Sequence, residues 1–321
     1  MKLGIIGCGY WGPKCVRALK SVTGAELEWI ADADASTLET YRKEGYKVTT
    51  KYHDILRDET ITGVLVLTPA SSHYTIIKDC LKAGKHVFVE KPLTTSSADA
   101  KKLITLAEFK KVKLMTGHIY LFHPAIQYIK EAMRRRDLKP PLHFHFQRRS
   151  PGPVRKDVNV LWDLGPHEVS IMAHLTGSTP TSISSLGMDI HGHGHPDIVT
   201  VNLAFKKGIT SSMVFSWIDP IKIRDLTIIS RRKTLVFNDM AKEKVMIYDT
   251  TKARPDSGMQ PEVLPIAAQI PTIEPLREEL QHFVDCLNSG SNPLVSGHDG
   301  LAVVQILENI EKSMKRKTLN K

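Results

Sequence analysis

A glycine-rich turn near the N-terminus constrains the fold of this chain more than any other feature. Residues 2–6 form a short apolar run, and Gly7, Gly9 and Gly12 follow it before a stretch of helical character. In such a strand–turn–helix unit, Gly7 permits the tight turn, Gly9 lets a pyrophosphate approach backbone N–H groups, and Gly12 permits close helix packing. The sequence therefore predicts a dinucleotide site, and a glycine turn without a ligand is the weaker alternative.

The second apolar run, residues 27–31, ends at a carboxylate that bears on cofactor choice. Asp32 stands about twenty residues beyond the glycines, where an acidic side chain can accept hydrogen bonds from the adenosine ribose hydroxyls. Because a carboxylate there repels a 2′-phosphate, Asp32 favours NAD over NADP. Asp34 is expected to cap the next helix instead. Tyr10 and Trp11, inside the glycine turn, are further candidates for cofactor contact.

Short apolar runs alternate with helical segments through the first half of the chain. This alternation favours a parallel sheet covered by helices, which is the Rossmann architecture when a glycine turn follows the first strand. A helix is expected near residues 72–83, ended by Gly84. The predicted strands are residues 2–6, 27–31, 64–67, 86–89 and 112–115.

Successive strand-like runs replace this alternation in the second half and favour a large, mostly antiparallel sheet. We therefore expect an α/β protein with a Rossmann NAD-binding domain over residues 1–120 and a catalytic and oligomerisation α+β domain over residues 121–321. Helices near 276–288 and 299–315 can pack back on the first domain, and the stretch 251–275 is interpreted as irregular. The predicted strands are residues 142–147, 198–205, 209–217, 226–230, 234–237 and 245–248.

Composition excludes several classes of protein. The net charge is +10, but Lys and Arg are scattered through predicted helices without interleaved aromatics, which indicates a solvated surface or an anionic substrate rather than nucleic-acid binding. No apolar run approaches the ~20 residues that span a bilayer. The four cysteines show neither metal-binding spacing nor a disulfide framework, which favours reduced thiols and a cytoplasmic location. The broad second sheet needs cover, so we expect a homo-oligomer, either a dimer or a tetramer.

Two further segments resemble a known family. They are Thr68-Pro69-Ala70-Ser71-Ser72-His73, and the stretch from Gly84 to Pro92 that contains Glu90-Lys91-Pro92. With the glycine turn they resemble the Gfo/Idh/MocA family, named for glucose-fructose oxidoreductase and inositol dehydrogenase, over essentially the whole chain. The resemblance implies contact between NAD and Thr68, Pro69, His73, Glu90 and Lys91.

Lys91 ends a predicted strand, at the edge where ligands of an open parallel sheet bind. A cation there can stabilise an oxygen that develops negative charge during hydride transfer. Position alone would equally suit an exposed loop lysine. The resemblance implies that Lys91 is catalytic, because the matching lysine is catalytic in these enzymes.

Asp163 and His167 form a second candidate for catalysis. They lie four residues apart at the expected start of a helix, with Pro166 in its first turn. Both side chains can therefore emerge on one face of the helix. A carboxylate beside an imidazole holds its tautomer and raises its basicity, although a capping Asp and a surface His would show the same spacing. The resemblance implies that His167 is the general base and Asp163 its partner.

The run 158–169 and the later run 216–220 resemble the branch that acts on nucleotide-linked sugars, including UDP-N-acetylglucosaminuronate 3-dehydrogenases. Ser150 stands where those members usually carry asparagine. The candidates for substrate contact are Tyr120, Arg148, Arg149, Asn159 and His167; the two arginines suit phosphate or carboxylate. His191, His193 and His195 could ligate a metal by composition, but the alternating glycines fix no geometry, so no metal is predicted.

The resulting hypothesis is NAD-dependent oxidation of a secondary hydroxyl on a nucleotide-linked sugar, at C3 of a UDP-N-acetylhexosamine or its uronate. A polyol dehydrogenase of the inositol type and a 3-keto nucleotide-sugar reductase are alternatives on the same scaffold. A noncatalytic NAD(H)-sensing protein is a third alternative, and the presence of Lys91, Asp163 and His167 together speaks against it.

Overall fold

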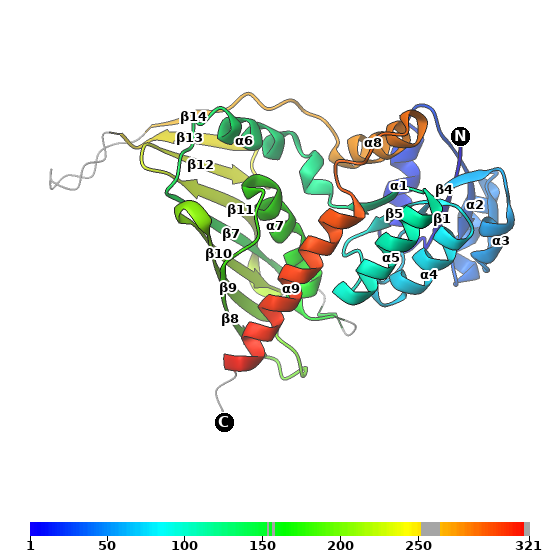
Figure 1. The fold of residues 1–321 in the computed structure, drawn as a ribbon, viewed down its shortest axis with the longest axis horizontal. Helices are drawn as coiled ribbons and strands as arrows, with labels where there is room; N and C mark the ends of the chain where they lie inside the picture. Colours follow the sequence, from blue (N-terminus) through cyan, green and yellow to red (C-terminus); the bar gives the residue numbers. More distant parts are fainter. Residues whose placement is uncertain (153, 156–157, 252–263, 318–321) are drawn as a thin grey trace. The chain divides into compact units, whose positions relative to one another are not determined.

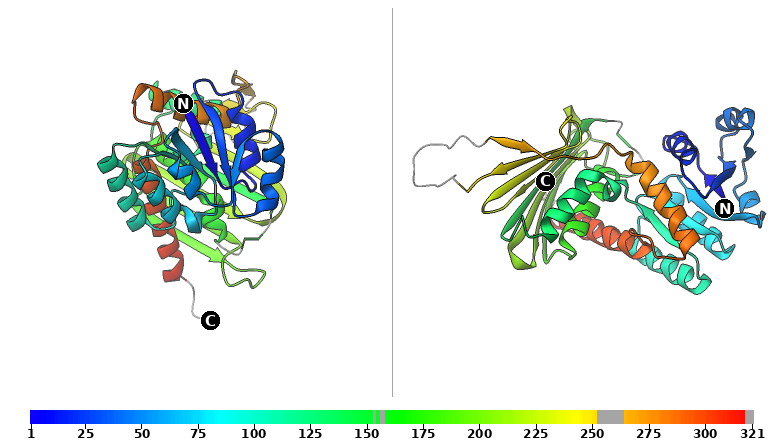
Figure 2. Two further views of the ribbon diagram at one scale, coloured as in Figure 1. Left: turned by 90° about the vertical axis from the view of Figure 1, so that its right-hand side faces the viewer. Right: turned by 90° about the horizontal axis from the view of Figure 1, so that it is seen from above.

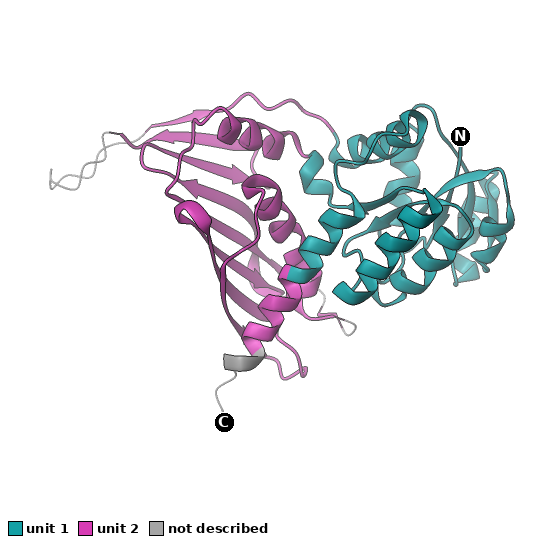
Figure 3. Ribbon diagram, viewed as in Figure 1, with its two compact units in different colours: residues 1–122, 274–305 teal, residues 123–273, 306–321 magenta. Residues whose placement is uncertain are grey.

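The computed structural model describes residues 1–152, 154–155, 158–251 and 264–317. The chain divides into two units, each with its own sheet (Figure 3). Residues 1–122 and 274–305 form the first unit, and residues 123–273 and 306–321 form the second. Helix α9 (Gly297–Lys317) contributes to both units, because the boundary falls inside it.

The described part of the first unit contains a six-stranded parallel sheet in the order β3-β2-β1-β4-β5-β6, of which Figure 1 labels β1, β4 and β5. The order reverses between β1 and β4, and ligands of such sheets bind beyond the carboxyl ends of the strands near this reversal. The predicted Rossmann architecture is confirmed, although the three-residue strand β3 was not predicted. The strands are β1 (Lys2–Ile6), β2 (Glu26–Ala31), β3 (Lys47–Thr49), β4 (Ile61–Val66), β5 (His86–Glu90) and β6 (Leu114–Gly117).

Helices cover both faces of this sheet. Right-handed crossovers place the helices after β1 and β2 on one face and those after β4 and β5 on the other. On the first face α1 and α8 bury Leu3, Ile5 and Phe283 in one core. Gly84, at φ 73°, follows the end of α4, as predicted. The helices are α1 (Gly12–Leu19), α2 (Ala35–Lys43), α3 (His53–Arg57), α4 (Ala70–Lys82), α5 (Ser97–Lys110), the 3₁₀ helix η1 (Ile119–Phe122) and α8 (Pro275–Ser289).

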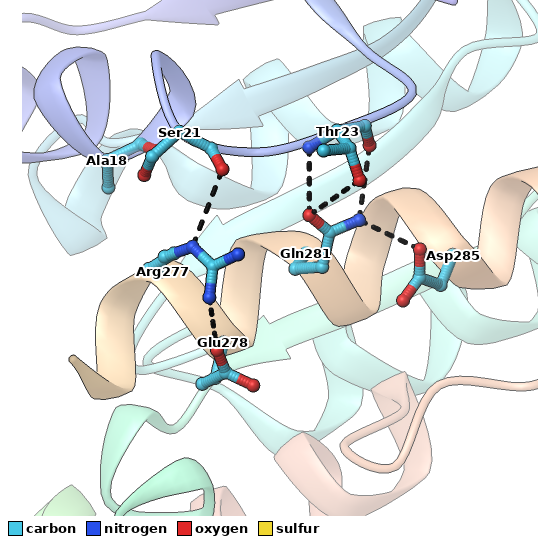
Figure 4. A network of polar contacts seen from close by, with 7 residues as sticks. All are labelled: Ala18, Ser21, Thr23, Arg277, Glu278, Gln281 and Asp285. Carbon is cyan, nitrogen blue, oxygen red and sulfur yellow. Dashed lines mark hydrogen bonds and ion pairs between the residues drawn. The ribbon is translucent and has the colours of Figure 1, made fainter. Parts of the chain in front are cut away.

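Polar contacts join helix α8 to the loop that follows α1 (Figure 4). The Gln281 side chain accepts a hydrogen bond from the Thr23 backbone N–H at 2.9 Å and donates one to the Thr23 carbonyl at 3.1 Å. Arg277 donates to the Ser21 carbonyl at 3.4 Å. A helix from late in the sequence is therefore part of the first unit.

The described part of the second unit contains an eight-stranded sheet in the order β14-β13-β12-β11-β7-β10-β9-β8. All neighbouring strands are antiparallel except β7 and β10. The predicted large, mostly antiparallel sheet is confirmed. The strands are β7 (Leu142–Pro151), β8 (Ser182–Met188), β9 (Ile198–Phe205), β10 (Ile209–Ser216), β11 (Ile218–Ile229), β12 (Lys233–Asn238), β13 (Val245–Asp249) and β14 (Pro265–Ala267).

The two faces of this sheet differ. Helices α6 (Pro124–Arg134) and α7 (Val160–Thr176), with the later turns of α9, cover one face (Figures 1 and 2). Strand β7 directs Phe144 and Phe146 to this covered face, where both are buried. Residues of the opposite parity, such as His143 and His145, lie on the open face and bond to Thr210 and Ser212 of β10. The 3₁₀ helix η2 (Lys206–Gly208) joins β9 to β10.

Two sequence-based expectations about elements were wrong. Helix α7 begins at Val160, because the Asn159 side chain caps it by accepting from the Trp162 N–H at 3.2 Å. Pro166 therefore lies inside the helix rather than in its first turn. The stretch 251–275 is not irregular throughout, since residues 265–267 pair with β13 as strand β14 and α8 begins at residue 275; residues 252–263 lie outside the described part of the chain.

Within the described residues, no helix is long and apolar enough to cross a membrane. The four cysteines, Cys8, Cys15, Cys80 and Cys286, are all buried and carry free thiols. They lie in helices or at the glycine turn of the first unit, where they serve as small apolar side chains.

Candidate active site

The glycine turn after β1 is shaped as the sequence predicts for a dinucleotide site. Gly7 has φ 94°, and a Cβ there would come within 2.7 Å of the Thr68 side chain. A Cβ at Gly12 would come within 2.6 Å of the Cys8 sulfur, so only glycine lets the start of α1 pack so closely. A Cβ at Gly9 would meet nothing within 4 Å, which leaves the backbone open to a ligand. The turn therefore fits a bound pyrophosphate.

Asp32 lies beside this turn. Its carboxylate accepts from the Cys8 backbone N–H at 2.6 Å and from the Asp34 N–H at 2.9 Å. Asp34 instead caps α2 by accepting from the Ser36 N–H at 2.9 Å, which confirms the predicted cap. A carboxylate joined to the glycine turn stands where the adenosine ribose of a dinucleotide is expected.

Tyr10 and Trp11 stand with a cation at the same turn. The Lys14 ammonium lies 3.6 Å from the centroid of the Tyr10 ring and 4.5 Å from that of Trp11. Tyr10 is 80% exposed, so this ring projects from the turn. Two aromatic rings and one positive charge can together contact an anionic, aromatic ligand such as a dinucleotide.

The turns after β4 and β5 are tied together by His73. This buried imidazole contacts the Thr68 carbonyl and the Pro92 carbonyl, each at 2.8 Å. Burial lowers the pKa of His73, so the ring is held neutral and donates to one of these carbonyls at a time. The bridge fixes the segment that carries Lys91, and the Lys91–Pro92 peptide bond is cis.

Glu90 is buried at the end of β5, immediately before Lys91. Its carboxylate accepts from the Lys91 backbone N–H at 2.5 Å. Burial raises the pKa of Glu90 to about 7, although the Lys91 charge opposes the shift. A second buried carboxyl, Glu279 of α8, has its pKa raised well above the usual value by burial and by the charge of Glu90. Sequence reasoning did not identify Glu279.

His118 is a further residue that sequence reasoning did not assign to the site. Glu90 pairs with Gly117 across β5 and β6, so Lys91 and His118 leave the same edge of the sheet from adjacent strands. Neither ring nitrogen of His118 has a hydrogen-bond partner within the described residues, and the side chain is 1% exposed. Burial, and then the Lys91 charge, lower the pKa of His118 to about 3. Tyr120 follows two residues later in η1 and is also buried.

In the second unit, helix α7 positions Asp163 and His167 one turn apart. The Asp163 carboxylate accepts from the Trp217 indole N–H at 3.0 Å and from Arg155 at 3.3 Å. His167 is 9% exposed. Residues four apart on a helix face the same side, so the carboxylate and imidazole emerge together. An imidazole and a carboxylate are the side chains from which a general base and its orienting acidic residue can be built.

The candidates for substrate contact in the second unit lie in different surroundings. Arg148 is 5% exposed on the covered face of the sheet, where it is paired with Glu168 of α7. Arg149, with the opposite parity in β7, is paired with Asp219 at 3.1 Å. The Asn159 side chain caps α7 and also donates to Glu311 at 3.1 Å. The two adjacent arginines therefore do not share one site.

The histidines of the 191–195 segment have partners other than a metal. His191 pairs with Asp197 at 3.0 Å, and the His195 ring contacts the Arg155 carbonyl at 2.9 Å. The His191 and His193 rings stack with centroids 5.8 Å apart. The described residues contain no cluster of three or more histidine, cysteine or acidic side chains suited to a metal.

Comparison with known families identifies the chain. Residues 1–118 match an oxidoreductase family with an NAD-binding Rossmann fold, and residues 126–236 match the GFO/IDH/MocA C-terminal domain. The chain belongs to the Gfo/Idh/MocA family. Its cofactor is NAD, and the protein is an NAD-dependent dehydrogenase.

Individual Gfo/Idh/MocA relatives act on different alcohols. Myo-inositol 2-dehydrogenase of Thermotoga maritima is 26% identical over 99% of this chain and 97% of the relative. UDP-N-acetylglucosamine 3-dehydrogenase of Acidithiobacillus ferrooxidans is 30% identical over 59% of this chain and 58% of the relative. A solved structure of the latter enzyme has a TM-score of 0.87 and 23% identity and covers 100% of this chain and 99% of that one, which shows the shared fold. The chain thus belongs to an NAD-binding family of sugar and polyol oxidoreductases.

Proposed function

We propose that the enzyme oxidises a secondary hydroxyl of a nucleotide-linked sugar, at C3 of a UDP-N-acetylhexosamine or its uronate. The observation that carries this proposal is the similarity to UDP-N-acetylglucosamine 3-dehydrogenase, 30% identical over 189 residues. The placement of Asp163 and His167 four residues apart on helix α7 suits the acid–base chemistry that such an oxidation needs.

Each proposed catalytic residue has one role. Bound NAD supplies the acceptor for the hydride that leaves the carbinol carbon. His167 removes the hydroxyl proton, Asp163 holds the His167 tautomer, and Lys91 stabilises the negative charge that develops on the oxygen. The proton thus passes to the imidazole, and the carbon becomes a carbonyl.

Binding roles are proposed from position. In the first unit, the pyrophosphate lies over the open backbone at Gly9 and the ribose hydroxyls bind Asp32, with Tyr10 and Trp11 beside them. Tyr120 and Asn159 contact the substrate, whereas Arg149 lies on the open face of the sheet, paired with Asp219. Arg148 is already neutralised by Glu168, so we assign it a structural role in holding α7 to the sheet. The remaining proposed NAD contacts are Gly7, Gly12, Thr68, Pro69, His73, Glu90 and Lys91.

We assign cofactor binding to a domain over residues 1–120 and catalysis and assembly to a domain over residues 121–321. The division into units supports this assignment for most of the chain, with residues 274–305 added to the first unit. A cytoplasmic location is proposed because free buried thiols and NAD chemistry both suit a reducing compartment.

A homo-oligomer is proposed from the open face of the second sheet. Leu186 and Met188 of β8 are 53% and 57% exposed there, and Ile229 of β11 is 45% exposed. Apolar side chains spread over one sheet face favour cover by a second copy of the chain.

A polyol dehydrogenase is the second candidate, favoured by the match to myo-inositol 2-dehydrogenase along 99% of the chain. Turnover with UDP-N-acetylglucosamine, its uronate and myo-inositol, followed as NADH formation, separates the two. If myo-inositol turned over as efficiently as every UDP-sugar, the nucleotide-sugar proposal would fail, and the assignment of the protein as a dehydrogenase would be unaffected.

The catalytic roles are tested with Lys91→Ala and His167→Ala. Each variant is expected to keep NAD affinity and to lose at least roughly a hundredfold in turnover, because acid–base and oxyanion assistance each contribute on that scale. Near-normal turnover by either folded, NAD-binding variant would rule out its catalytic role.

A further inference from the structure

Both carboxylate oxygens of Asp163 are held by donors that lie outside helix α7. The Trp217 indole N–H donates to Oδ2 at 3.0 Å, and an Arg155 guanidinium N–H donates to Oδ1 at 3.3 Å. The Asp163 side chain is 19% exposed, and Trp217 is 2% exposed. The partly buried Asp163 carboxylate is thus held by hydrogen bonds from two side chains, those of Trp217 and Arg155.

Trp217 is itself fixed by the sheet. It joins β10 to β11, its backbone N–H donates to the Asp197 carbonyl at 3.1 Å, and its carbonyl accepts from the Gly152 N–H at 2.9 Å. Because both of its backbone polar groups are bonded and its ring is buried, the indole N–H points in a set direction. The position of Asp163 is therefore coupled to the sheet, and not only to its own helix.

The histidine-rich segment supports the same two donors. The His195 ring packs edge-to-face on the Trp217 indole, with centroids 6.2 Å apart and planes at 86°. The same ring bonds to the Arg155 carbonyl at 2.9 Å. Asp197 anchors the segment by accepting from the Ile190 and His191 N–H groups, at 3.1 and 3.0 Å. His195 thus touches both residues that hold Asp163.

An aspartate that sets the tautomer of a catalytic imidazole must keep one side-chain orientation, because a rotated carboxylate would leave the imidazole unoriented. We propose that Trp217 is a positioning residue that orients Asp163 toward His167, with Arg155 as the second donor and His195 as support for both. The inference rests on the proposed function, since it assigns Asp163 its role beside His167.

The test compares two tryptophans that make the same kind of bond. Trp29 donates its indole N–H to Asp58 at 2.8 Å, and both residues belong to the first unit, whereas Asp163 belongs to the second. Trp217→Phe and Trp29→Phe each delete one indole–carboxylate bond. Trp217→Phe is expected to lower kcat about tenfold, the scale of one lost charge-assisted bond, with the affinity for NAD unchanged. Trp29→Phe should leave kcat within about twofold of the unaltered enzyme.

Arg155→Met is a second variant in case the smaller ring at 217 disturbs the fold. Arg155 has a 38% exposed side chain, so its replacement is tolerable, and kcat should again fall while NAD affinity stays. A double-mutant cycle completes the test. If Trp217 acts through Asp163, then Trp217→Phe costs little further turnover once Asp163→Ala is present.

The outcomes separate this inference from the proposed function. The inference fails if folded Trp217→Phe and Arg155→Met enzymes match Trp29→Phe in kcat, or if the Trp217→Phe loss is undiminished in the Asp163→Ala background. Full turnover by Asp163→Ala or His167→Ala would instead overturn the proposed catalytic pair, and the inference with it. If Asp163→Ala and His167→Ala lose turnover but Trp217→Phe does not, the inference about Trp217 fails and the proposed catalytic pair stands.

Discussion

Charge at one residue is expected to decide cofactor choice. Asp32→Ser removes the carboxylate that would meet a 2′-phosphate and keeps a hydroxyl that can accept from the Cys8 N–H. The preference for NAD over NADP should fall by about tenfold or more, which corresponds to roughly 1.4 kcal/mol. Fluorescence titration with both cofactors measures this preference.

Asp34→Ser is the matched control for that titration. It removes the same charge two residues away and keeps a side chain that can cap α2. Its cofactor preference should stay that of the unaltered enzyme. Equal effects of the two substitutions would show that general charge, and not the position of Asp32, sets the preference.

The buried imidazole of His118 is expected to cost stability at acidic pH. Its pKa is about 3 in the folded chain against an ordinary 6.5, so between these values the unfolded chain binds a proton that the folded chain does not. Stability therefore falls as pH drops through this window. His118→Phe, of similar shape and without polar atoms, should melt no lower than the unaltered protein at neutral pH and lose less stability on acidification.

The measurement for His118 is the melting temperature at several pH values between about 7 and 5. His73 and the other buried histidines are present in both proteins, so their contribution to the pH dependence cancels. Parallel curves for the two proteins would contradict the assignment of this acid sensitivity to His118.

At the scale of elements, apolar packing should hold helix α8 in the first unit more strongly than its polar contacts do. Leu280 is fully buried, and Leu280→Ala is expected to cost about 2–5 kcal/mol. Gln281→Ala removes the contacts to Thr23 shown in Figure 4, but water can replace them, so about 0.5–1.5 kcal/mol is expected. Denaturant unfolding of the two variants measures both losses in the free energy of unfolding. A larger loss for Gln281→Ala than for Leu280→Ala would contradict the prediction.

The elements that sequence reasoning found are those with enough residues to show a pattern. The long strands β7, β9 and β10 could be predicted, because apolar residues recur at alternate positions that are buried in the sheet. Strand β8 was missed, since its sequence is rich in serine and places Ser185, which bonds to a helix α9 carbonyl, where an apolar residue is expected. Strand β14 has three residues, too few for any periodicity to show.

The start of α7 shows why boundaries are harder than elements. Proline favours the first turn, so Pro166 predicted a helix beginning nearby. Asn159 caps the helix earlier, and α7 continues through the proline. The spacing of Asp163 and His167 was unaffected, because four residues span about one turn wherever the helix begins.

At the scale of the whole molecule, sequence reasoning could propose site residues that form local motifs but not the contacts that hold them. The glycine turn lies within one short segment, whereas Trp217 reaches Asp163 across 54 residues. That contact depends on how β10 and β11 join, which no local pattern encodes. His118 was likewise missed, because its significance comes from burial beside Lys91 and not from its neighbours in sequence.

Assembly of the chain is expected to depend on the open face of the second sheet. Ile229 lies on central strand β11, opposite in parity to buried Ile228, so a charge there would not disturb the covered core but would be buried in an interface. Ile229→Glu should therefore weaken the oligomer, because burying an unpaired carboxylate costs several kcal/mol. Phe109→Glu on α5 is the control, since Phe109 is 79% exposed and belongs to the first unit, not to this sheet. Sedimentation over a range of concentrations should show dissociation for Ile229→Glu alone; a monomeric unaltered enzyme, or equal masses for all three proteins, would refute assembly through this face.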